Sequence, residues 1–188
     1  MDERACKIAS AGYDVISKYG IRRATMGDVA EAAGVSRQTV YNIFPNREAL
    51  LAGVARYHFT SKWVAIRAFA EKEGDRQKRF EILLDKLVVE SWTSMQAMPH
   101  ADELELEIAT TIKHEIADIH AEARRYLCEF LLPYEEALRQ RNMTPRGLGD
   151  MLHHAIVGLK LSSTTREEIE SATATMLSCL MAVTQGSS

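Results

Sequence analysis

Four polar side chains lie close together in one short stretch of the sequence, and their types suit hydrogen bonding to the edges of DNA bases. They are Arg37, Gln38, Thr39 and Asn42. Arginine pairs with guanine, glutamine and asparagine pair with adenine, and the threonine methyl group contacts thymine in the major groove. We therefore expect these residues to face bases, with solvated surface as the alternative interpretation for one of the four.

The elements that must position these side chains are two short helices joined by a tight turn. A capping pattern at Thr25 predicts the start of the first helix, and Gly34 predicts its end, because glycine permits a sharp reversal of the chain. Ser36 predicts the N-terminal cap of the second helix. Val40 and Phe44 are the apolar residues that pack this second helix against the rest of the motif, and this leaves the polar residues facing outward.

The rest of the chain also predicts helices, so the expected fold class is all-α. No segment shows the sustained alternation of polar and apolar residues that a strand requires. Pro133 lies inside a long helical pattern and predicts a kink or a split there. The expected helices span about residues 3–19, 25–34, 37–43, 47–72, 75–95, 102–111, 114–138, 145–160 and 165–183.

The distribution of charge agrees with a small nucleic-acid-binding module attached to a non-binding region. The net charge of the whole chain is −3. Residues 1–56 hold eight Lys and Arg against six Asp and Glu, whereas the remaining residues hold fifteen against twenty. A mildly basic head on an acidic body is typical of this organisation, although an imbalance of this size is weak support on its own.

The stretch around the two short helices resembles the N-terminal signature of the tetracycline-repressor (TetR) family of one-component regulators. Tyr19-Gly20-Ile21 and Arg23-Ala24-Thr25 lead into this signature. The residues that carry the resemblance are Ala33-Gly34-Val35-Ser36, Thr39, Tyr41, Phe44, Glu48 and Leu50-Leu51. Positions 38 and 47 depart from the usual pattern, since Gln38 and Arg47 replace the family's Gly and Lys.

The resemblance implies an N-terminal three-helix DNA-binding head with a helix-turn-helix over residues 1–46. A larger helical body for effector binding and dimerisation would follow over residues 47–188. It also implies phosphate contacts from Thr25, Ser36, Tyr41 and Arg47. The expected function is a repressor that leaves double-stranded operator DNA when a small apolar or aromatic effector binds.

Aromatic and sulfur-containing residues at helical spacing in the body are candidates for the effector site. A closed hydrophobic core is the alternative interpretation, because periodicity does not separate a core from a cavity. His114 or Tyr126 would act as the polar anchor for a ligand. The candidate ligand-binding residues are Trp63, Trp92, Met95, His114, Tyr126 and Phe130.

The two C-terminal helical patterns each carry one apolar stripe, and the resemblance implies that they pair with their copies in a homodimer. Stripes that are exposed in a lone subunit favour a two-fold interface. The candidate interface residues are Leu152, Ile156, Leu159, Met176 and Leu180.

Other function classes have weaker support in the sequence. A helical-bundle enzyme or metal protein, with the N-terminal helices as scaffold, is the alternative function. His100, His114 and His120 with Asp102 or Asp118 could form a metal site, but surface or core histidines are the more ordinary interpretation. The chain shows no motif of an enzyme and no required cofactor. Three widely spaced cysteines, together with the absence of a long apolar run or a signal peptide, favour a reduced cytoplasmic protein without membrane contact.

Overall fold

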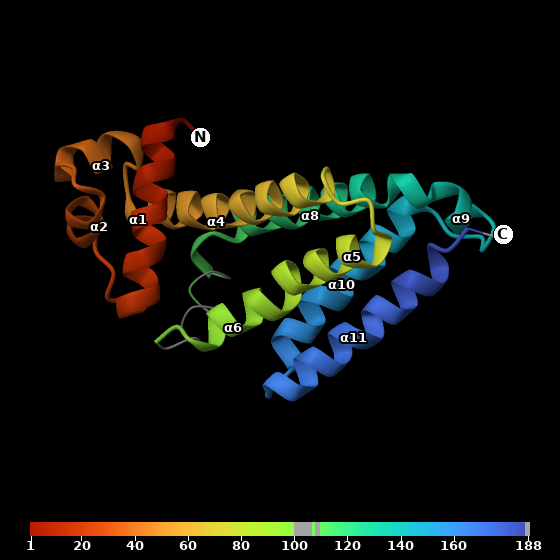
Figure 1. The fold of residues 1–188 in the computed structure, drawn as a ribbon. Helices are drawn as coiled ribbons and strands as arrows, with labels where there is room; N and C mark the ends of the chain where they lie inside the picture. The colour runs from red at the N-terminus through yellow and green to blue at the C-terminus, as the bar shows by residue number, and fades with distance from the viewer. Residues whose placement is uncertain (100–106, 108–109, 187–188) are drawn as a thin grey trace. The chain divides into compact units, whose positions relative to one another are not determined.

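The computed structural model describes residues 1–99, 107 and 110–186 (Figure 1). All regular elements in these described residues are helical, which confirms the predicted all-α class. The α-helices are α1 (Glu3–Tyr19), α2 (Met26–Ala33), α3 (Arg37–Ile43), α4 (Arg47–Ala70), α5 (Arg76–Leu84), α6 (Glu90–Gln96), α8 (Lys113–Leu131), α9 (Glu135–Arg139), α10 (Pro145–Ser162) and α11 (Arg166–Val183). A π-helical turn, η1 (Asp85–Val89), and a 3₁₀ turn, η2 (Leu132–Tyr134), complete the set.

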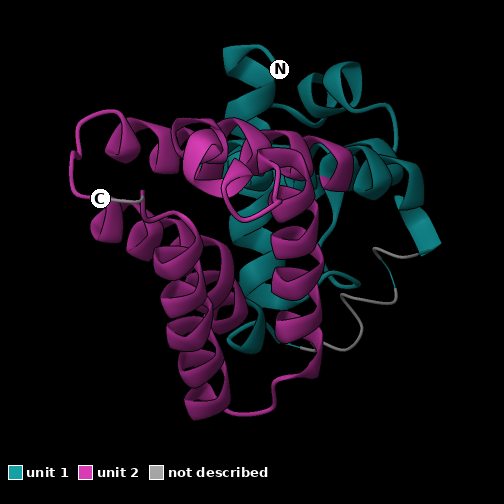
Figure 2. Ribbon diagram, turned by 90° about the vertical axis from the view of Figure 1, so that its right-hand side faces the viewer, with its two compact units in different colours: residues 1–61, 95–119 teal, residues 62–94, 120–188 magenta. Residues whose placement is uncertain are grey.

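The chain divides into two compact units (Figure 2). Unit 1 contains residues 1–61 and 95–119, and unit 2 contains residues 62–94 and 120–188. Helix α4 therefore contributes residues to both units, as does α8. The division of the chain at residue 46 into two functional domains stays a prediction.

Unit 1 holds α3 in place through a small apolar core. Helix α1 packs against α2, and α2 packs against α3. Ile8, Val29 and Val40 are each at most 1% exposed. Phe44, the residue that ends α3, is also buried, and its ring lies against Gly53 of α4. These contacts bury one side of α3, as the sequence predicts.

The helix ends in unit 1 follow from local capping chemistry. Asp28 and Thr25 form the predicted reciprocal capping box at the start of α2. Gly34 has φ +64°, a left-handed conformation that favours glycine, and its N–H donates to the Ala30 and Glu31 carbonyls. The Ser36 hydroxyl accepts a hydrogen bond from the Thr39 N–H and caps α3. The predicted helix-turn-helix is therefore present at its predicted residues.

Unit 2 is built around α5, η1, α10 and α11. Helix α11 packs against α5 and η1, and α10 packs against η1 and α11. The apolar pattern that begins after Asp75 predicts one helix, but the structure interrupts it at η1. Pro133 splits the following long pattern, as expected, because proline lacks the N–H that would continue the helix. The expected short helix over residues 102–111 lies largely outside the described residues.

The contact between Phe44 and Gly53 gives a first prediction. A methyl group at Gly53 would lie 2.4 Å from Phe44 Cε1, which is far too close for two carbon atoms. We expect Gly53→Ala to destabilise the chain by about 1–3 kcal/mol, because a buried ring must move. Urea denaturation measures this loss. In the double variant with Phe44→Leu, the total loss should be smaller than the sum of the two single losses, and strict additivity would contradict this packing.

Candidate functional site

The outward side of α3 carries the side chains expected to read bases. Gln38 and Asn42 are exposed, and Gln38 Nε2 donates a hydrogen bond of 2.9 Å to Asn42 Oδ1. Tyr41 is 46% exposed on the same short helix. Val40, on the buried side, has no exposed surface. The structure thus presents two amide side chains together on one exposed face of α3.

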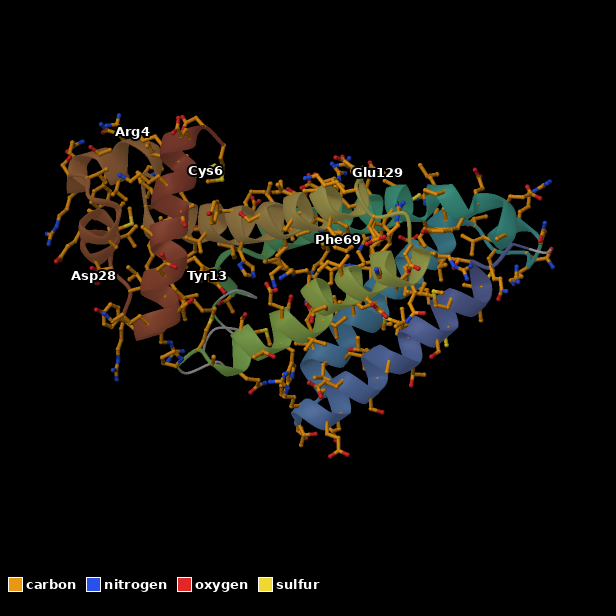
Figure 3. The ribbon with its side chains drawn as sticks, viewed as in Figure 1. Arg4, Cys6, Tyr13, Asp28, Phe69 and Glu129 are labelled. Carbon is orange, nitrogen blue, oxygen red and sulfur yellow. The ribbon has the colours of Figure 1, made fainter. Side chains whose placement is uncertain are left out.

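Two of the residues expected at phosphates serve as helix caps. The Thr25 hydroxyl donates to Asp28 Oδ2 at 2.7 Å, and the Thr25 N–H donates to the same oxygen at 3.0 Å. These hydrogen bonds hold the pKa of Asp28, labelled in Figure 3, below its usual range. Ser36 Oγ lies 2.9 Å from Thr39 Oγ1, so these two hydroxyls interact at the start of α3. Both caps remain exposed, so DNA can reach them.

Arg37 lies over the first turn of α2. A methyl group at Gly27 would be 2.9 Å from Arg37 Nη2, so the guanidinium group covers that glycine. The charge of Arg37 also contributes, as the smallest of the causes, to the lowered pKa of Asp28. Arg37 is nevertheless exposed. Its base contact therefore stays a prediction.

Arg47 is engaged within the protein. Its Nη1 forms an ion pair of 2.5 Å with Glu107 Oε1, and its Nη2 donates to the Ile21 carbonyl at 2.6 Å. Glu107 Oε2 also lies 4.0 Å from Arg22 Nε. The sequence gives no sign of this partner, which is 60 residues away. The predicted phosphate contact of Arg47 therefore requires this ion pair to open, and such half-exposed pairs contribute only about 0–1 kcal/mol.

Arg23 is a candidate that the sequence reasoning did not select. It is exposed in the turn between α1 and α2, two residues before the Thr25 cap. A guanidinium group beside a capping residue that faces DNA can bind a phosphate. Its position in the sequence, directly before the helix-turn-helix, is the signal that could have identified it.

The six candidate ligand residues do not form one group within either unit. Met95 and His114 belong to unit 1. His114 is exposed, whereas the polar anchor of a ligand pocket would be withdrawn from solvent, so its role as an anchor gains no support. In unit 2, the rings of Trp63 and Tyr126 lie 5.1 Å apart. Trp92 is buried, and its Nε1 donates a 3.1 Å hydrogen bond to the Ser163 carbonyl at the end of α10.

Aromatic residues also meet further along unit 2. Phe130 is 8% exposed, and its ring lies 5.9 Å from the ring of Phe80. Phe80 lies 5.2 Å from the ring of Tyr134. The hydroxyl of Tyr126 donates to Glu122 Oε1 at 3.1 Å. These side chains are packed against protein groups, as expected for the core interpretation, and their binding of a ligand stays a prediction.

The sequence predicts that the apolar stripes of the two C-terminal helices are exposed in a lone subunit, and the structure corrects this for three of the candidate interface residues. Leu152, Ile156 and Leu180 are 1%, 5% and 1% exposed, so they pack inside the chain's own core rather than on its surface. Leu159 and Met176 are half-buried. An apolar stripe on an amphipathic helix shows only that some partner covers it, and here the partner for those three residues lies within the same chain.

Two histidines lie together inside unit 2. His153 of α10 is 7% exposed, and its ring centroid lies 4.9 Å from that of His120 of α8. Burial, followed by the neighbouring His120 and Arg124, lowers the pKa of His153 to about 4. His153 is therefore neutral at pH 7.

The described residues give two further negative findings. No group of three or more His, Cys, Asp or Glu among them is placed to hold a metal ion. His100 and Asp102, two of the candidate metal ligands, lie outside the described residues. No helix in the described part of the chain combines the length and the apolarity needed to cross a membrane.

The N-terminal region matches a known family. The family described as bacterial regulatory proteins, tetR family, matches residues 8–54, which include all of α2 and α3. Residues 8–54 of the chain are thus similar to the N-terminal region of this family. This confirms the resemblance found in the helix-turn-helix residues.

Curated relatives match this chain over part of their length. The chain is 33% identical over 55 residues to an uncharacterised HTH-type transcriptional regulator of Mycobacterium bovis, which is 29% of each chain. It is 29% identical over 80 residues to the uncharacterised HTH-type transcriptional regulator YvdT of Bacillus subtilis, which is 43% of this chain and 41% of that protein. The matches thus span less than half of the length of these relatives.

Solved structures share the fold along almost the whole chain. A putative TetR-family regulator from Rhodococcus sp. matches with a TM-score of 0.72 and 21% identity, over 98% of this chain and 100% of that one. The regulator FadR from Bacillus subtilis, in complex with stearoyl-CoA, matches with a TM-score of 0.59 and 16% identity, over 97% and 98%. At such identities, the likeness concerns the fold.

The buried His153 gives a prediction for the dependence of stability on pH. Above pH 6.5 the ring is neutral in both the folded and the unfolded chain. Between pH 6.5 and about 4, His153 binds a proton in the unfolded chain but not in the folded chain. The free energy of unfolding therefore falls as the pH falls through this window. Urea denaturation of His153→Gln should show a shallower fall than the wild type, whereas His114→Gln, at an exposed histidine of unit 1, should follow the wild type. If the free energy of unfolding depends on pH with the same slope in His153→Gln and the wild type, the burial of His153 is contradicted.

Proposed function

We propose that this chain is a tetR-family transcriptional repressor that binds operator DNA as a homodimer and leaves it when a small molecule binds the helical body. Residues 1–46 act as the DNA-binding head, and residues 47–188 as the body. The observation that carries the proposal is the exposed face of α3, with Gln38 and Asn42 side by side above the buried Val40.

Base reading by α3 has a clear physical basis. Glutamine and asparagine amides each offer a donor and an acceptor, which matches the adenine edge in the major groove. Their mutual hydrogen bond aligns both amides before DNA arrives. Thr25, Ser36, Tyr41 and Arg23 would bind phosphates around them, which positions the helix without reading the sequence.

The homodimer would use the outer faces of α10 and α11. Met151 and Leu161 of α10 are 54% and 56% exposed, and Gly158 lies between them on the exposed side. On α11, Ala174, Ser178 and other small residues are exposed at one-turn spacing, so a second helix can approach closely. A two-fold axis through this surface would pair it with itself. Of the residues that the sequence suggested, the half-buried Leu159 and Met176 stay candidates for this interface, whereas Leu152, Ile156 and Leu180 are buried within the chain.

The effector would act by a shift of population. A ligand releases the operator only when it binds the non-binding conformation more tightly than the DNA-binding one. The aromatic groups of unit 2 favour an apolar or aromatic effector. Helix α4 can carry the response, because it is one continuous helix that contains residues of both units. A gel shift with the DNA that flanks the chain's own gene tests the proposed repressor.

The DNA-binding proposal predicts different effects for two exposed residues of α3. Gln38→Ala should relax the preference at particular base pairs by about 1–3 kcal/mol, because a bidentate contact is lost. Tyr41→Phe should weaken binding to specific and random DNA equally, because a phosphate contact carries no sequence information. Fluorescence anisotropy with both kinds of duplex measures the two losses. Gln77→Ala is the matched control, since Gln77 is an exposed glutamine with an i,i+4 hydrogen bond in unit 2. A uniform loss for Gln38→Ala would count against base reading.

The proposed homodimer predicts that a charge at one exposed leucine disrupts dimerisation, whereas a charge at another exposed leucine does not. Leu161→Glu should produce monomers in analytical ultracentrifugation and weaken operator binding, because it places charges at the two-fold interface. Leu132→Glu is the matched control, since Leu132 is 51% exposed but lies in η2, outside α10 and α11. Dimers of unchanged stability for Leu161→Glu would refute this interface.

A further inference from the structure

Unit 2 contains a cluster of basic side chains that its carboxylates do not balance. We define the basic cluster as Lys62 of α4, His120 of α8, and His153 and Lys160 of α10. His153 is buried, and the other three are half-buried. Basic groups withdrawn from water are costly to keep charged unless an anion lies beside them. The partners of each cluster member therefore decide what the cluster can bind.

The two lysines of the basic cluster lack carboxylate partners. Lys62 Nζ donates to Ser91 Oγ at 2.6 Å and to the Lys86 carbonyl at 3.4 Å, and both acceptors are neutral. The amino group of Lys160 forms neither an ion pair nor a hydrogen bond with the residues that the structure describes. Burial lowers the pKa of Lys160, and it lowers that of Lys62 to about 8.

Two carboxylates of unit 2 on the elements around the cluster pair with other cations. Glu90 forms an ion pair with Lys86, and Asp150 lies 3.7 Å from Arg124. Glu90 partly offsets the lowered pKa of Lys62 but does not reach it as an ion-pair partner. Asp85 and Glu90 both act on Lys86, and neither forms an ion pair with Lys62 or Lys160 among the described residues.

The members of the cluster are close enough to influence one another. The rings of His120 and His153 meet edge to face at 4.9 Å. The charge of Lys160 lowers the pKa values of Lys62, His120 and His153, which come from three different helices. Helix α10 also packs against η1, the turn next to Ser91. Side chains from α4, α8 and α10 therefore lie within electrostatic range of Lys160 in unit 2.

We propose that the basic cluster of unit 2 is an anion-binding site, which takes the carboxylate or phosphate group of a small molecule. Lys160 and Lys62 supply the charge, and His120 and His153 supply N–H donors around it. An apolar remainder of that molecule follows from the proposed function and not from the cluster itself. The identification of this molecule with the effector rests on the proposed function, whereas its binding does not.

The test measures binding of simple anions to the full-length chain at pH 7. Decanoate and 1-decanol differ mainly in charge, and inorganic phosphate provides the anion without an apolar tail. Sodium chloride at equal ionic strength is the reference. We expect decanoate to raise the melting temperature more than decanol, and inorganic phosphate to raise it above the chloride reference.

Variants of the cluster separate this site from general charge effects. Lys160→Met should weaken decanoate binding about tenfold in isothermal titration, because a charge-assisted hydrogen bond is lost. It should not lower the melting temperature, because it removes an unpartnered buried cation. Lys62→Met should weaken binding in the same direction, and the exposed Lys78→Met should bind as the wild type does.

Proton uptake provides a readout that a purely structural cluster would not give. An anion raises the pKa of each basic neighbour, so binding should draw protons from the buffer. The binding heat of decanoate should therefore differ between two buffers of different ionisation enthalpy. This difference should shrink in Lys160→Met.

Three results would each overturn the site: equal stabilisation by decanol and decanoate, no effect of either anion beyond that of chloride, or unchanged binding by Lys160→Met. The repressor proposal fails separately. A chain that binds these anions but no operator DNA keeps the site and loses the repressor function. If decanoate binds without changing DNA affinity, the site stands and its link to release is refuted.

Discussion

The exposed side of α3 is held in position because the other side of this helix is buried. A helix of seven residues is not stable alone in water, because nucleation costs more than so few hydrogen bonds return. Val40 and Phe44 supply the missing stability by packing into the core of unit 1. Gly53 leaves room for the Phe44 ring, and Gly34 sets the direction in which α3 leaves α2. The exposed amides of Gln38 and Asn42 owe their position to these apolar contacts.

Helix α4 connects this packing to the body. Gly53, against which Phe44 packs, and Lys62, a member of the basic cluster, lie nine residues apart in the same helix, or roughly 14 Å along its axis. The proposed effector response needs such a covalent connection, because Gly53 belongs to unit 1 and Lys62 to unit 2.

The sequence predicts the features that depend on local chemistry and misses those that depend on distant partners. Thr25, Gly34, Ser36 and Pro133 act on their immediate neighbours, so the helix ends and the split near Leu132 are found at the expected residues. The ion pair of Arg47 with Glu107 and the burial of Leu152 and Ile156 within the chain depend on tertiary contacts. Helical periodicity shows an apolar face but not which surface covers it. The basic cluster was likewise invisible, since its members are widely separated in the sequence.

The central claim is that two copies of α3 enter successive major grooves of operator DNA. Hydroxyl-radical footprinting on an operator selected from random DNA tests it most directly. Our account predicts two protected half-sites on one face of the duplex, with centres about one helical turn apart or slightly more, near 34–36 Å. It also predicts that Gln38→Ala alters which sequences are selected while leaving this spacing unchanged. A single protected site, or no protection on any selected sequence, would contradict the account.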